Sequence, residues 1–123
     1  MYYALVYYPK IESHLFHDLR QTFEPFASLM PEHVPLIFPV SESIGLNNLI
    51  NHINSILKKW NQFEIHFCGL EKTWDHWLIL MIKEGNRFIV QLHDIFYTGL
   101  LQPYLRKDLP FTPHLALGYF GYE

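Results

Sequence analysis

The sequence predicts an α+β fold made of two related β-α-β lobes. Short runs of β-branched and aromatic residues alternate with longer segments whose apolar residues recur every three or four positions, in the order strand, helix, strand, helix, strand, strand, helix, strand. Twice, a strand and a helix lead into a strand that opens with histidine, once at His33 and once at His114. No linker rich in Gly, Pro or Ser divides the chain, so we expect residues 1–123 to form a single two-lobed domain.

The first half of the chain is predicted to contain two strands and a helix. Residues 2–8 are aromatic and β-branched and end at Pro9, which lacks a backbone N–H and breaks the strand. Residues 11–28 form an amphipathic helix, which Pro25 is expected to kink or end. Its apolar positions are Leu15, Leu19, Phe23 and Phe26. Residues 33–40, bracketed by prolines, form the second strand.

The next helix has the clearest pattern in the sequence. Ser43 is the expected N-cap, and the helix is expected to run to about Trp60. Its apolar stripe comprises Leu46, Leu49, Ile50, Ile53, Ile56, Leu57 and Trp60. The opposite face carries Asn47, Asn48, Asn51, Asn54, Lys58 and Lys59, so we expect this helix to cover a sheet with one side in water.

The remaining elements follow the same patterns. Residues 63–68 alternate apolar and polar side chains and residues 77–83 are a continuous apolar run, which predicts two adjacent strands. A turn at Gly85-Asn86 precedes a helix with Phe88, Leu92, Ile95 or Phe96, and Leu100 on one face, closed by Pro103. Residues 114–120 form the last strand, directly after Pro113.

The composition is typical of one globular domain. Half of the 123 residues are hydrophobic and 17% are charged, which suits a chain with one core and excludes a disordered one. Cys68 is alone and forms no internal disulfide, and the start of the chain lacks the basic region and long apolar run of a signal peptide. No apolar stretch reaches the roughly 18 residues of a membrane helix. We therefore expect a cytoplasmic protein that does not contact a membrane.

The charge balance restricts the partners. The formal net charge is −3, so the sequence offers no broad basic surface along which a nucleic-acid backbone could bind. We expect no binding to duplex DNA and only local contact with RNA. Eight histidines are the candidates for chemistry, because imidazole titrates near neutral pH.

Both histidine-headed strands begin with the same short pattern. Residues 33–36 read His-Val-Pro-Leu and residues 114–117 read His-Leu-Ala-Leu. Side chains alternate along a strand, so each histidine shares a face with Pro35 or Ala116 while the residues between them enter the core. The pattern also occurs at His76, so four residues alone are weak evidence. His33 and His114 are assigned as a pair because they occupy equivalent places in the repeated layout.

These segments resemble a known family, the 2H phosphoesterases or 2′-5′ RNA ligase-like proteins. Residues 31–39 (Pro-Glu-His-Val-Pro-Leu-Ile-Phe-Pro) and 111–117 (Phe-Thr-Pro-His-Leu-Ala-Leu) resemble its two His-apolar-Thr/Ser-apolar motifs, and residues 92–101 resemble the helix between them. The resemblance covers essentially the whole chain. It implies mostly antiparallel sheets flanking a central cleft, across which His33 and His114 face each other.

Two features depart from the family pattern. Pro35 and Ala116 stand where members carry the Thr or Ser that contacts phosphate. Members usually continue with a helix and a strand after the second motif, so the resemblance implies a shortened C-terminal lobe here.

The resemblance implies metal-independent cleavage, without a cofactor, of a 2′,3′-cyclic phosphate or a 2′-5′ phosphodiester in a nucleotide or RNA end. One histidine would activate water and the other would protonate the leaving oxygen. Pro35 and Ala116, with Arg106 and Lys107 before the second motif, are the candidate substrate-binding residues. Arg20 on the first helix is a further candidate cation.

Two alternatives stay open. Losing one oxyanion donor typically costs about 10²–10³ in rate, and Pro35 has no N–H to replace the hydroxyl, although Ala116 does. The chain could therefore be a catalytically degenerate module of the same fold that binds a nucleotide or phosphate. It could also be an interaction protein that uses its aromatic residues.

The other histidines give weaker candidates. His14, His17 and Asp18 share a helix but lack further metal ligands at a recognisable spacing. Glu64, His66 and Cys68 share a strand face, but residues two apart on a strand are roughly 6.6 Å apart, too far for a Cys–His hydrogen bond. We expect no metal site. We also expect surface or edge positions for His52, His76 and His93. The sequence has no Gly-rich phosphate loop, Cys-pair zinc motif or Gly-x-Ser-x-Gly elbow.

Overall fold

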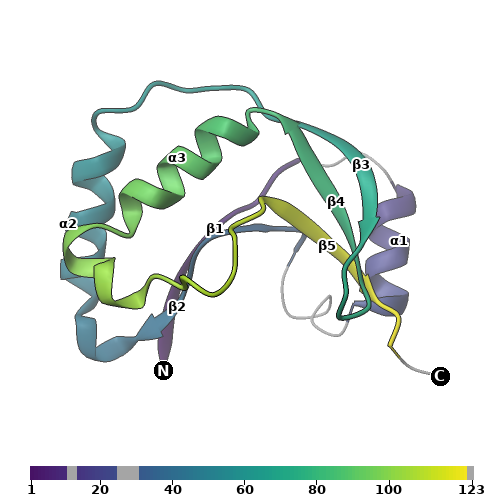
Figure 1. The fold of residues 1–123 in the computed structure, drawn as a ribbon, viewed down its shortest axis with the longest axis horizontal. Coiled ribbons are helices and arrows are strands. Elements are labelled where there is room, and N and C mark those ends of the chain that lie inside the picture. Colours follow the sequence, from purple (N-terminus) through teal and green to yellow (C-terminus); the bar gives the residue numbers. More distant parts are fainter. Residues whose placement is uncertain (11–13, 25–30, 122–123) are drawn as a thin grey trace.

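The computed structural model describes residues 1–10, 14–24 and 31–121, and its elements follow the predicted order (Figure 1). The strands are β1 (Tyr2–Tyr7), β2 (Val34–Ser41), β3 (His66–Lys72), β4 (Trp77–Glu84) and β5 (His114–Tyr119). The helices are α1 (His14–Phe23), α2 (Leu46–Leu57) and α3 (Asn86–Phe96), with 3-10 turns η1 (Glu42–Ile44) and η2 (Gly99–Tyr104).

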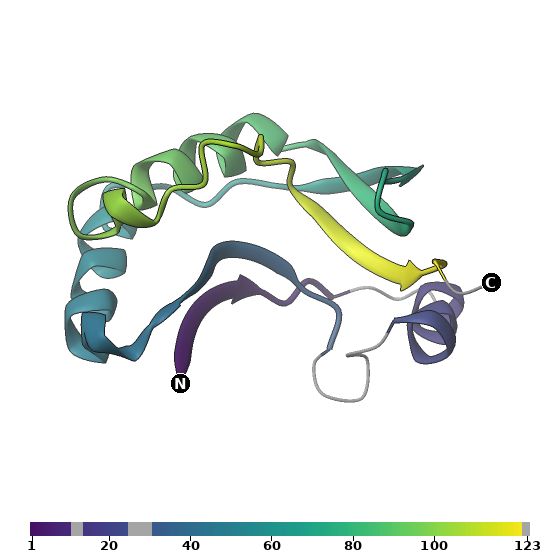
Figure 2. The same ribbon diagram turned by 60° about the horizontal axis from the view of Figure 1, so that its bottom comes forward.

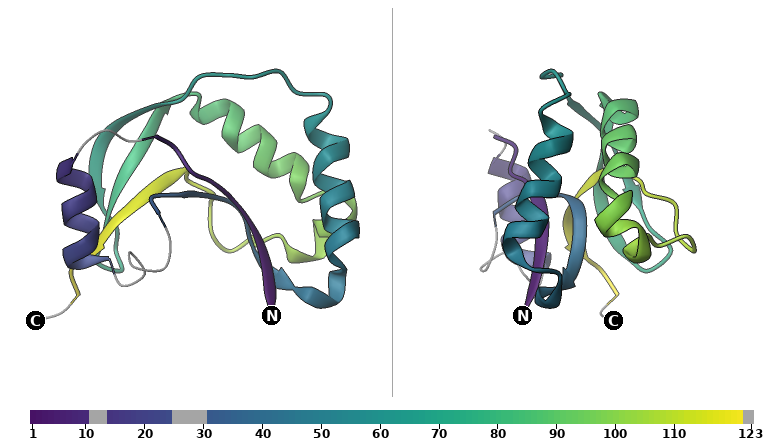
Figure 3. Two further views of the ribbon diagram at one scale, coloured as in Figure 1. Left: turned by 180° about the vertical axis from the view of Figure 1, so that it is seen from behind. Right: turned by 90° about the vertical axis from the view of Figure 1, so that its left-hand side faces the viewer.

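Two antiparallel sheets make up the fold, which confirms the predicted α+β class. One sheet pairs β1 with β2, and the other has the order β3-β4-β5. In Figure 2 the β1-β2 pair forms one layer and the β3-β4-β5 sheet with α3 forms the other. Helix α3 connects the two layers, because it contacts both β2 and β4, and α1 contacts β5. Figure 3 shows α1 at the end of the molecule where β5 ends, opposite α2.

Strand β2 of one sheet contacts strand β5 of the other, and the two strands run in opposite directions (Figures 1 and 2). Val34 at the start of β2 belongs to one buried cluster with Leu115 and Leu117 of β5. Further along β2, the ring of Phe38 meets Phe111 edge-on, with ring centroids 6.3 Å apart. The two histidine-headed strands are thus held together by buried residues after each histidine and by a ring contact with Phe111, just before β5.

Two clusters of buried residues form the core. The first lies between β2, α2, α3 and η2 and includes Ile37, Leu92 and Phe96; the second joins β2, β4, β5 and α3. Leu36 packs against both clusters, so the core is continuous across β2. Each fully buried aliphatic side chain contributes about 1.5–3 kcal/mol to folding.

Helix α1 packs tightly against the end of β5. The rings of Phe23 and Phe120 lie 4.6 Å apart, and a Cβ added at Gly118 would come within 2.7 Å of the Phe23 Cβ. The glycine is therefore needed for the close approach. The helix ends at Phe23, before Pro25, as predicted, while the predicted helical residues 11–13 and 25–28, Phe26 among them, and the side chain of Leu15 lie outside the described residues.

The predicted start of the second helix was wrong. Ser43 lies in η1, and its N–H donates to the hydroxyl oxygen of Ser41, which is the N-cap of that 3-10 turn. Helix α2 begins after Gly45, whose φ of 87° reorients the chain. Its buried stripe is also narrower than predicted, since Leu49 is buried while Leu46 and Ile50 are largely exposed.

The strand predicted at residues 63–68 begins later, at His66, and extends to Lys72. Phe63 and Ile65 still pack against the second cluster without pairing in the sheet, which explains the alternating pattern. A close approach explains the delayed start: a Cβ at Gly85 would lie 2.3 Å from the carbonyl oxygen of Glu64, so this segment passes directly over the β4-α3 junction.

Helix α3 starts where the turn was predicted but buries a different face. Gly85 is the N-cap in the left-handed conformation, and the helix begins at Asn86. Its buried residues are Ile89, Leu92, His93 and Phe96, whereas Phe88 is exposed. The helix ends at Phe96, and Pro103 lies inside η2 rather than closing the helix. Within the described residues, each helix is too short or too polar to cross a membrane.

Candidate functional site

The two histidines lie at the starts of the strands β2 and β5. His33 directly precedes β2, and His114 is the first residue of β5. Both side chains are half-buried, while the residues that follow them, Val34 and Leu115, are 0% exposed and share one core cluster. Burial of these neighbours fixes the backbone that carries each imidazole.

Both imidazoles make the same contact with their own backbone. His33 Nδ1 lies 2.9 Å from the carbonyl oxygen of Pro31, and His114 Nδ1 lies 2.6 Å from that of Thr112. A carbonyl oxygen only accepts hydrogen bonds, so Nδ1 carries the hydrogen in both rings. This leaves Nε2 to exchange a proton with a ligand, and neither Nε2 has a hydrogen-bond partner among the described residues.

A pocket of about 610 Å³ adjoins His114. It is lined by Phe38, Pro39, Val40, His93, Tyr97, Tyr104, Arg106, Leu109, Pro110, Phe111, Thr112 and His114. The walls are mainly aromatic and apolar. Of the predicted site residues, the pocket brings together His114 and Arg106, whereas His33, Pro35, Ala116 and Lys107 do not line it.

Pro35 and Ala116 occupy the positions two residues after the histidines, and both are half-buried. Ala116 pairs with Ile79 of β4, and Pro35 pairs with Val6 of β1. Along β5, half-buried and buried side chains alternate from His114 to Leu117, so Ala116 shares the face of His114. On this face, neither position offers a side-chain donor.

Of the two cations predicted before the second motif, Arg106 lines the pocket and Lys107 does not. Arg106 donates two hydrogen bonds to Asp108, from Nε at 3.0 Å and from the terminal nitrogen at 2.7 Å. Hydrogen bonding and charge attraction within this pair raise the pKa of Arg106 and lower the pKa of Asp108. Lys107 is exposed and does not line the pocket. The pair with Asp108 uses Nε and one terminal nitrogen, so three of the five guanidinium N–H donors remain for another acceptor.

Arg20 is a buried structural residue. Its guanidinium lies 2.9 Å from Glu24 and 3.5 Å from Glu32, and Glu32 also lies 3.1 Å from His17. Burial disfavours the charged form of Glu32, but a backbone hydrogen bond, His17 and Arg20 outweigh this and hold its pKa below the usual value. Because Glu32 precedes His33, Arg20 ties α1 to the turn that carries the first histidine.

The sequence interpretation missed His93, which was expected at the surface and is buried. Its ring stacks on Phe111 with centroids 3.9 Å apart, and its Nδ1 lies 3.0 Å from the Asp94 carboxylate. The signal was present in the helical spacing, because residues 89, 92, 93 and 96 form one face. Tyr97 is buried beside it, and its hydroxyl oxygen accepts a hydrogen bond from the Phe38 N–H at 2.9 Å. Burial raises the pKa of Tyr97.

His52 and His76, both expected to be surface or edge residues, differ in burial. His52 is half-buried, contrary to expectation, and its Nε2 donates to the carbonyl oxygen of Phe96 at 2.8 Å, which satisfies the end of α3. His76 is exposed at the β3-β4 turn with a φ of 72°, as an edge residue was expected to be.

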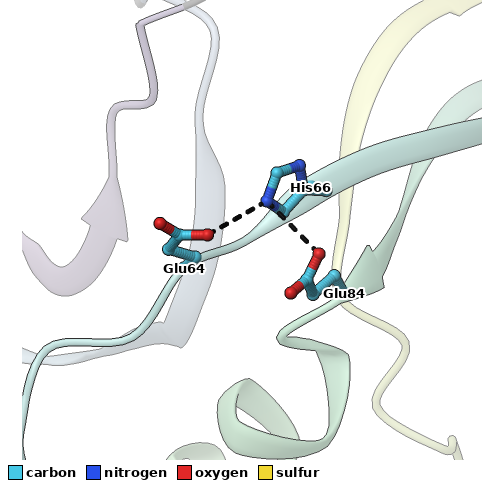
Figure 4. Close-up of side chains that lie close together, drawn as sticks. All are labelled: Glu64, His66 and Glu84. Atoms are coloured by element: carbon cyan, nitrogen blue, oxygen red, sulfur yellow. Dashed lines mark hydrogen bonds and ion pairs between the residues drawn. The ribbon is translucent and has the colours of Figure 1, made fainter.

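A group of potential metal ligands lies elsewhere, at the start of β3 (Figure 4). His66 Nε2 lies 3.4 Å from Glu64 and 3.3 Å from Glu84, which is its register partner on β4. All three side chains are exposed, and their ligand atoms lie within 4.8 Å of one another. Cys68 is exposed and lies outside the group. The cluster contains neither His33 nor His114.

The structure describes only part of the metal site considered on the first helix. His17 is bound to Glu32, and the side chain of His14 lies outside the described residues.

Comparison with known proteins supports the resemblance. Residues 8–122 match the 2'-5' RNA ligase superfamily. A protein of Bacillus cereus strain B4264 named "Putative phosphoesterase" is 25% identical over 104 residues, which are 83% of this chain and 59% of that protein. A protein of the same name from Bacillus mycoides strain KBAB4 is 23% identical over 108 residues, with the same coverage. The chain thus spans about three fifths of the length of these curated relatives.

Proposed function

Because the chain belongs to the 2'-5' RNA ligase superfamily, the family of the 2H phosphoesterases, we propose that it is a metal-independent phosphoesterase with His33 and His114 as its acid–base pair. The proposed substrate is a 2′,3′-cyclic phosphate or a 2′-5′ phosphodiester of a small nucleotide or RNA end. The observation that supports it best is the matched contact of each Nδ1 with the carbonyl oxygen two residues earlier.

This contact suits general acid–base catalysis. A neutral ring with its hydrogen on Nδ1 has a lone pair on Nε2 and can remove a proton from water. The other ring, protonated on both nitrogens, can donate from Nε2 to the leaving ribose oxygen. Water adds to phosphorus, the P–O bond to one ribose oxygen breaks, and the proton from the acid neutralises that oxygen. Since both rings have the same tautomer, their roles can exchange in the reverse direction.

A binding module of the same fold is the second candidate. Pro35 and Ala116 supply no hydroxyl to the phosphoryl group, and Arg106 is bound to Asp108. Each missing oxyanion donor lowers the rate by about 10²–10³. A cleft that retains nucleotide affinity without turnover would follow from these substitutions.

The test is hydrolysis of 2′,3′-cyclic nucleotides and 2′-5′ dinucleotides in EDTA. We expect turnover by the natural chain, its loss in His33→Ala and in His114→Ala, and its retention in His66→Ala, which removes an exposed histidine outside the site. Equal turnover by the natural chain and the His33→Ala, His114→Ala double variant would refute the proposal. Nucleotide binding without turnover, with activity gained only when Thr replaces Pro35 and Ala116, would identify the binding module.

A further inference from the structure

We propose that Glu64, His66 and Glu84 form a zinc-binding site on the surface of the β3-β4 pair, apart from the two motif histidines (Figure 4). Among the residues that the structure describes, these three side chains are the group whose potential ligand atoms all lie within 4.8 Å of one another. The proposal concerns metal binding and does not rest on the proposed phosphoesterase activity.

The alternating pattern of the chain brings two of the ligands to one face. Residues 63, 65 and 67 are half-buried and pack against the second core cluster, whereas Glu64 and His66 are exposed. Side chains alternate along an extended chain, so the inward packing of the odd-numbered residues directs Glu64 and His66 outward together.

The third ligand comes from the neighbouring strand. Glu84 is the last residue of β4 and the register partner of His66. The carbonyl oxygen of Glu64 lies so close to Gly85 that a Cβ there would approach it to 2.3 Å, which places Glu64 beside the end of β4. No local spacing in the sequence predicts this group, because strand pairing and the crossing of two segments bring it together.

The distances between the ligand atoms suit zinc. His66 Nε2 lies 3.4 Å from a carboxylate oxygen of Glu64 and 3.3 Å from one of Glu84. Zinc binds imidazole nitrogen and carboxylate oxygen at about 2.0–2.2 Å in a tetrahedral arrangement, which separates neighbouring ligand atoms by about 3.4 Å. Typical N–H···O hydrogen bonds are shorter, at about 2.9–3.0 Å. The two matched contacts therefore fit a shared ion better than a pair of hydrogen bonds.

The chemistry of the donor set indicates which metal binds. Magnesium and calcium favour sites made of oxygen atoms alone, whereas imidazole suits zinc. Two carboxylates balance the charge of Zn²⁺, and water can take the fourth position because the three side chains are exposed. The ion would join the start of β3, which lies at the edge of its sheet, to the end of β4. We therefore expect zinc to stabilise this strand pair.

Calorimetric titration of ZnCl₂ into the chelator-stripped natural chain at neutral pH tests the site. We expect Zn²⁺ to bind, and Glu64→Gln, His66→Ala and Glu84→Gln each to weaken binding at least about tenfold. Even the loss of an outer partner of a metal ligand costs about 10–100-fold. The matched controls Glu71→Gln and His76→Asn alter an exposed Glu and an exposed His outside the group, and both should bind Zn²⁺ as the natural chain does.

Thermal unfolding gives a second measurement. A metal that binds only the folded chain stabilises it, so Zn²⁺ should raise the Tm of the natural chain and not that of Glu84→Gln. No binding by the natural chain, or equal affinity of His66→Ala and His76→Asn, would overturn the site. Binding that is lost in Cys68→Ser and unchanged in Glu84→Gln would also overturn it, because the exposed thiol would then be the ligand.

The zinc site and the proposed catalysis can fail separately. The turnover assay is performed in EDTA, which removes the ion, and the zinc titration uses no substrate. A chain without turnover that binds Zn²⁺ as expected would keep the site and lose the proposed catalysis.

Discussion

The imidazole of His93 lies flat on the ring of Phe111, with centroids 3.9 Å apart and planes 4° apart. The pair joins α3 to the segment that leads into β5, and so supports the backbone just before His114. A stacked pair in this position stabilises the fold as well as the pocket wall.

Replacing His93 tests how much the stack contributes to stability. His93→Ala removes the stack and leaves a void, and we expect the free energy of unfolding to fall by about 2 kcal/mol. His93→Phe keeps a stacking ring and should cost about 1 kcal/mol or less. Urea unfolding measures both changes. Equal stability of the two variants would contradict the structural role of the stack.

Arg20 is expected to be the most sensitive charged residue. Its side chain is 2% exposed, so Arg20→Ala removes the cation beside Glu24, whose side chain is 5% exposed, and beside the less buried Glu32. Breaking a buried ion pair from one side costs about 3–5 kcal/mol. Arg106→Ala breaks a solvent-exposed pair and should change the free energy of unfolding much less than Arg20→Ala does. Denaturant unfolding of both variants gives the comparison.

Because the pKa of Glu32 is lowered, the free energy of unfolding depends on pH in the acid range. Its folded-state pKa lies below 4.5, so the unfolded chain binds the proton more readily than the folded one. The stabilisation is therefore fully present above the unfolded pKa and is lost as the pH falls through the folded pKa. We expect Glu32→Gln to be less stable than the natural chain at pH 7, and the difference to shrink as the pH drops below 4.5. A pH-independent difference in urea unfolding would contradict this.

Restoring a hydroxyl in the second motif should increase turnover. Ala116 shares the strand face of His114, and a Thr there can donate to a phosphoryl oxygen. We expect Ala116→Thr to raise kcat for a 2′,3′-cyclic nucleotide by at least about tenfold, within the range known for one oxyanion donor. Ala116→Val, which has the same shape without the hydroxyl, should show no gain. If both variants behave alike, shape rather than hydrogen bonding determines the rate.

Metal removal should leave the reaction unchanged. The ligand cluster of Glu64, His66 and Glu84 contains neither catalytic candidate. We therefore expect equal turnover in EDTA and in added Zn²⁺, and equal turnover of His66→Ala in both conditions. Loss of activity in EDTA, restored by a divalent cation, would contradict a metal-independent mechanism.

Local patterns in the sequence were sufficient for the element order, because burial imposes a period of two on strands and 3.6 on helices. The ends of elements depended on neighbours far along the chain. The late start of β3, for example, follows from the approach of Glu64 to Gly85, and the start of α2 follows from a 3-10 turn that the Ser43 signal did not reveal.

In the candidate site, too, some features could be predicted from local sequence patterns and others depend on contacts between distant segments. His33 and His114 stand out because the chain repeats a layout around them. The pocket combines β2, α3 and the segment before β5, and no sequence pattern links Phe38, His93 and Phe111. The pairing of Arg20 with Glu32 likewise joins positions whose proximity depends on how α1 is turned.

The place of α1 has a consequence for how the two motifs behave together. Through Arg20 the helix holds Glu32, the neighbour of His33, and through Phe23 it rests on Gly118 of the strand that His114 begins. One ten-residue helix thus contacts the surroundings of both histidines. A substitution that displaces α1 is therefore expected to alter the surroundings of both histidines, although it lies in neither motif.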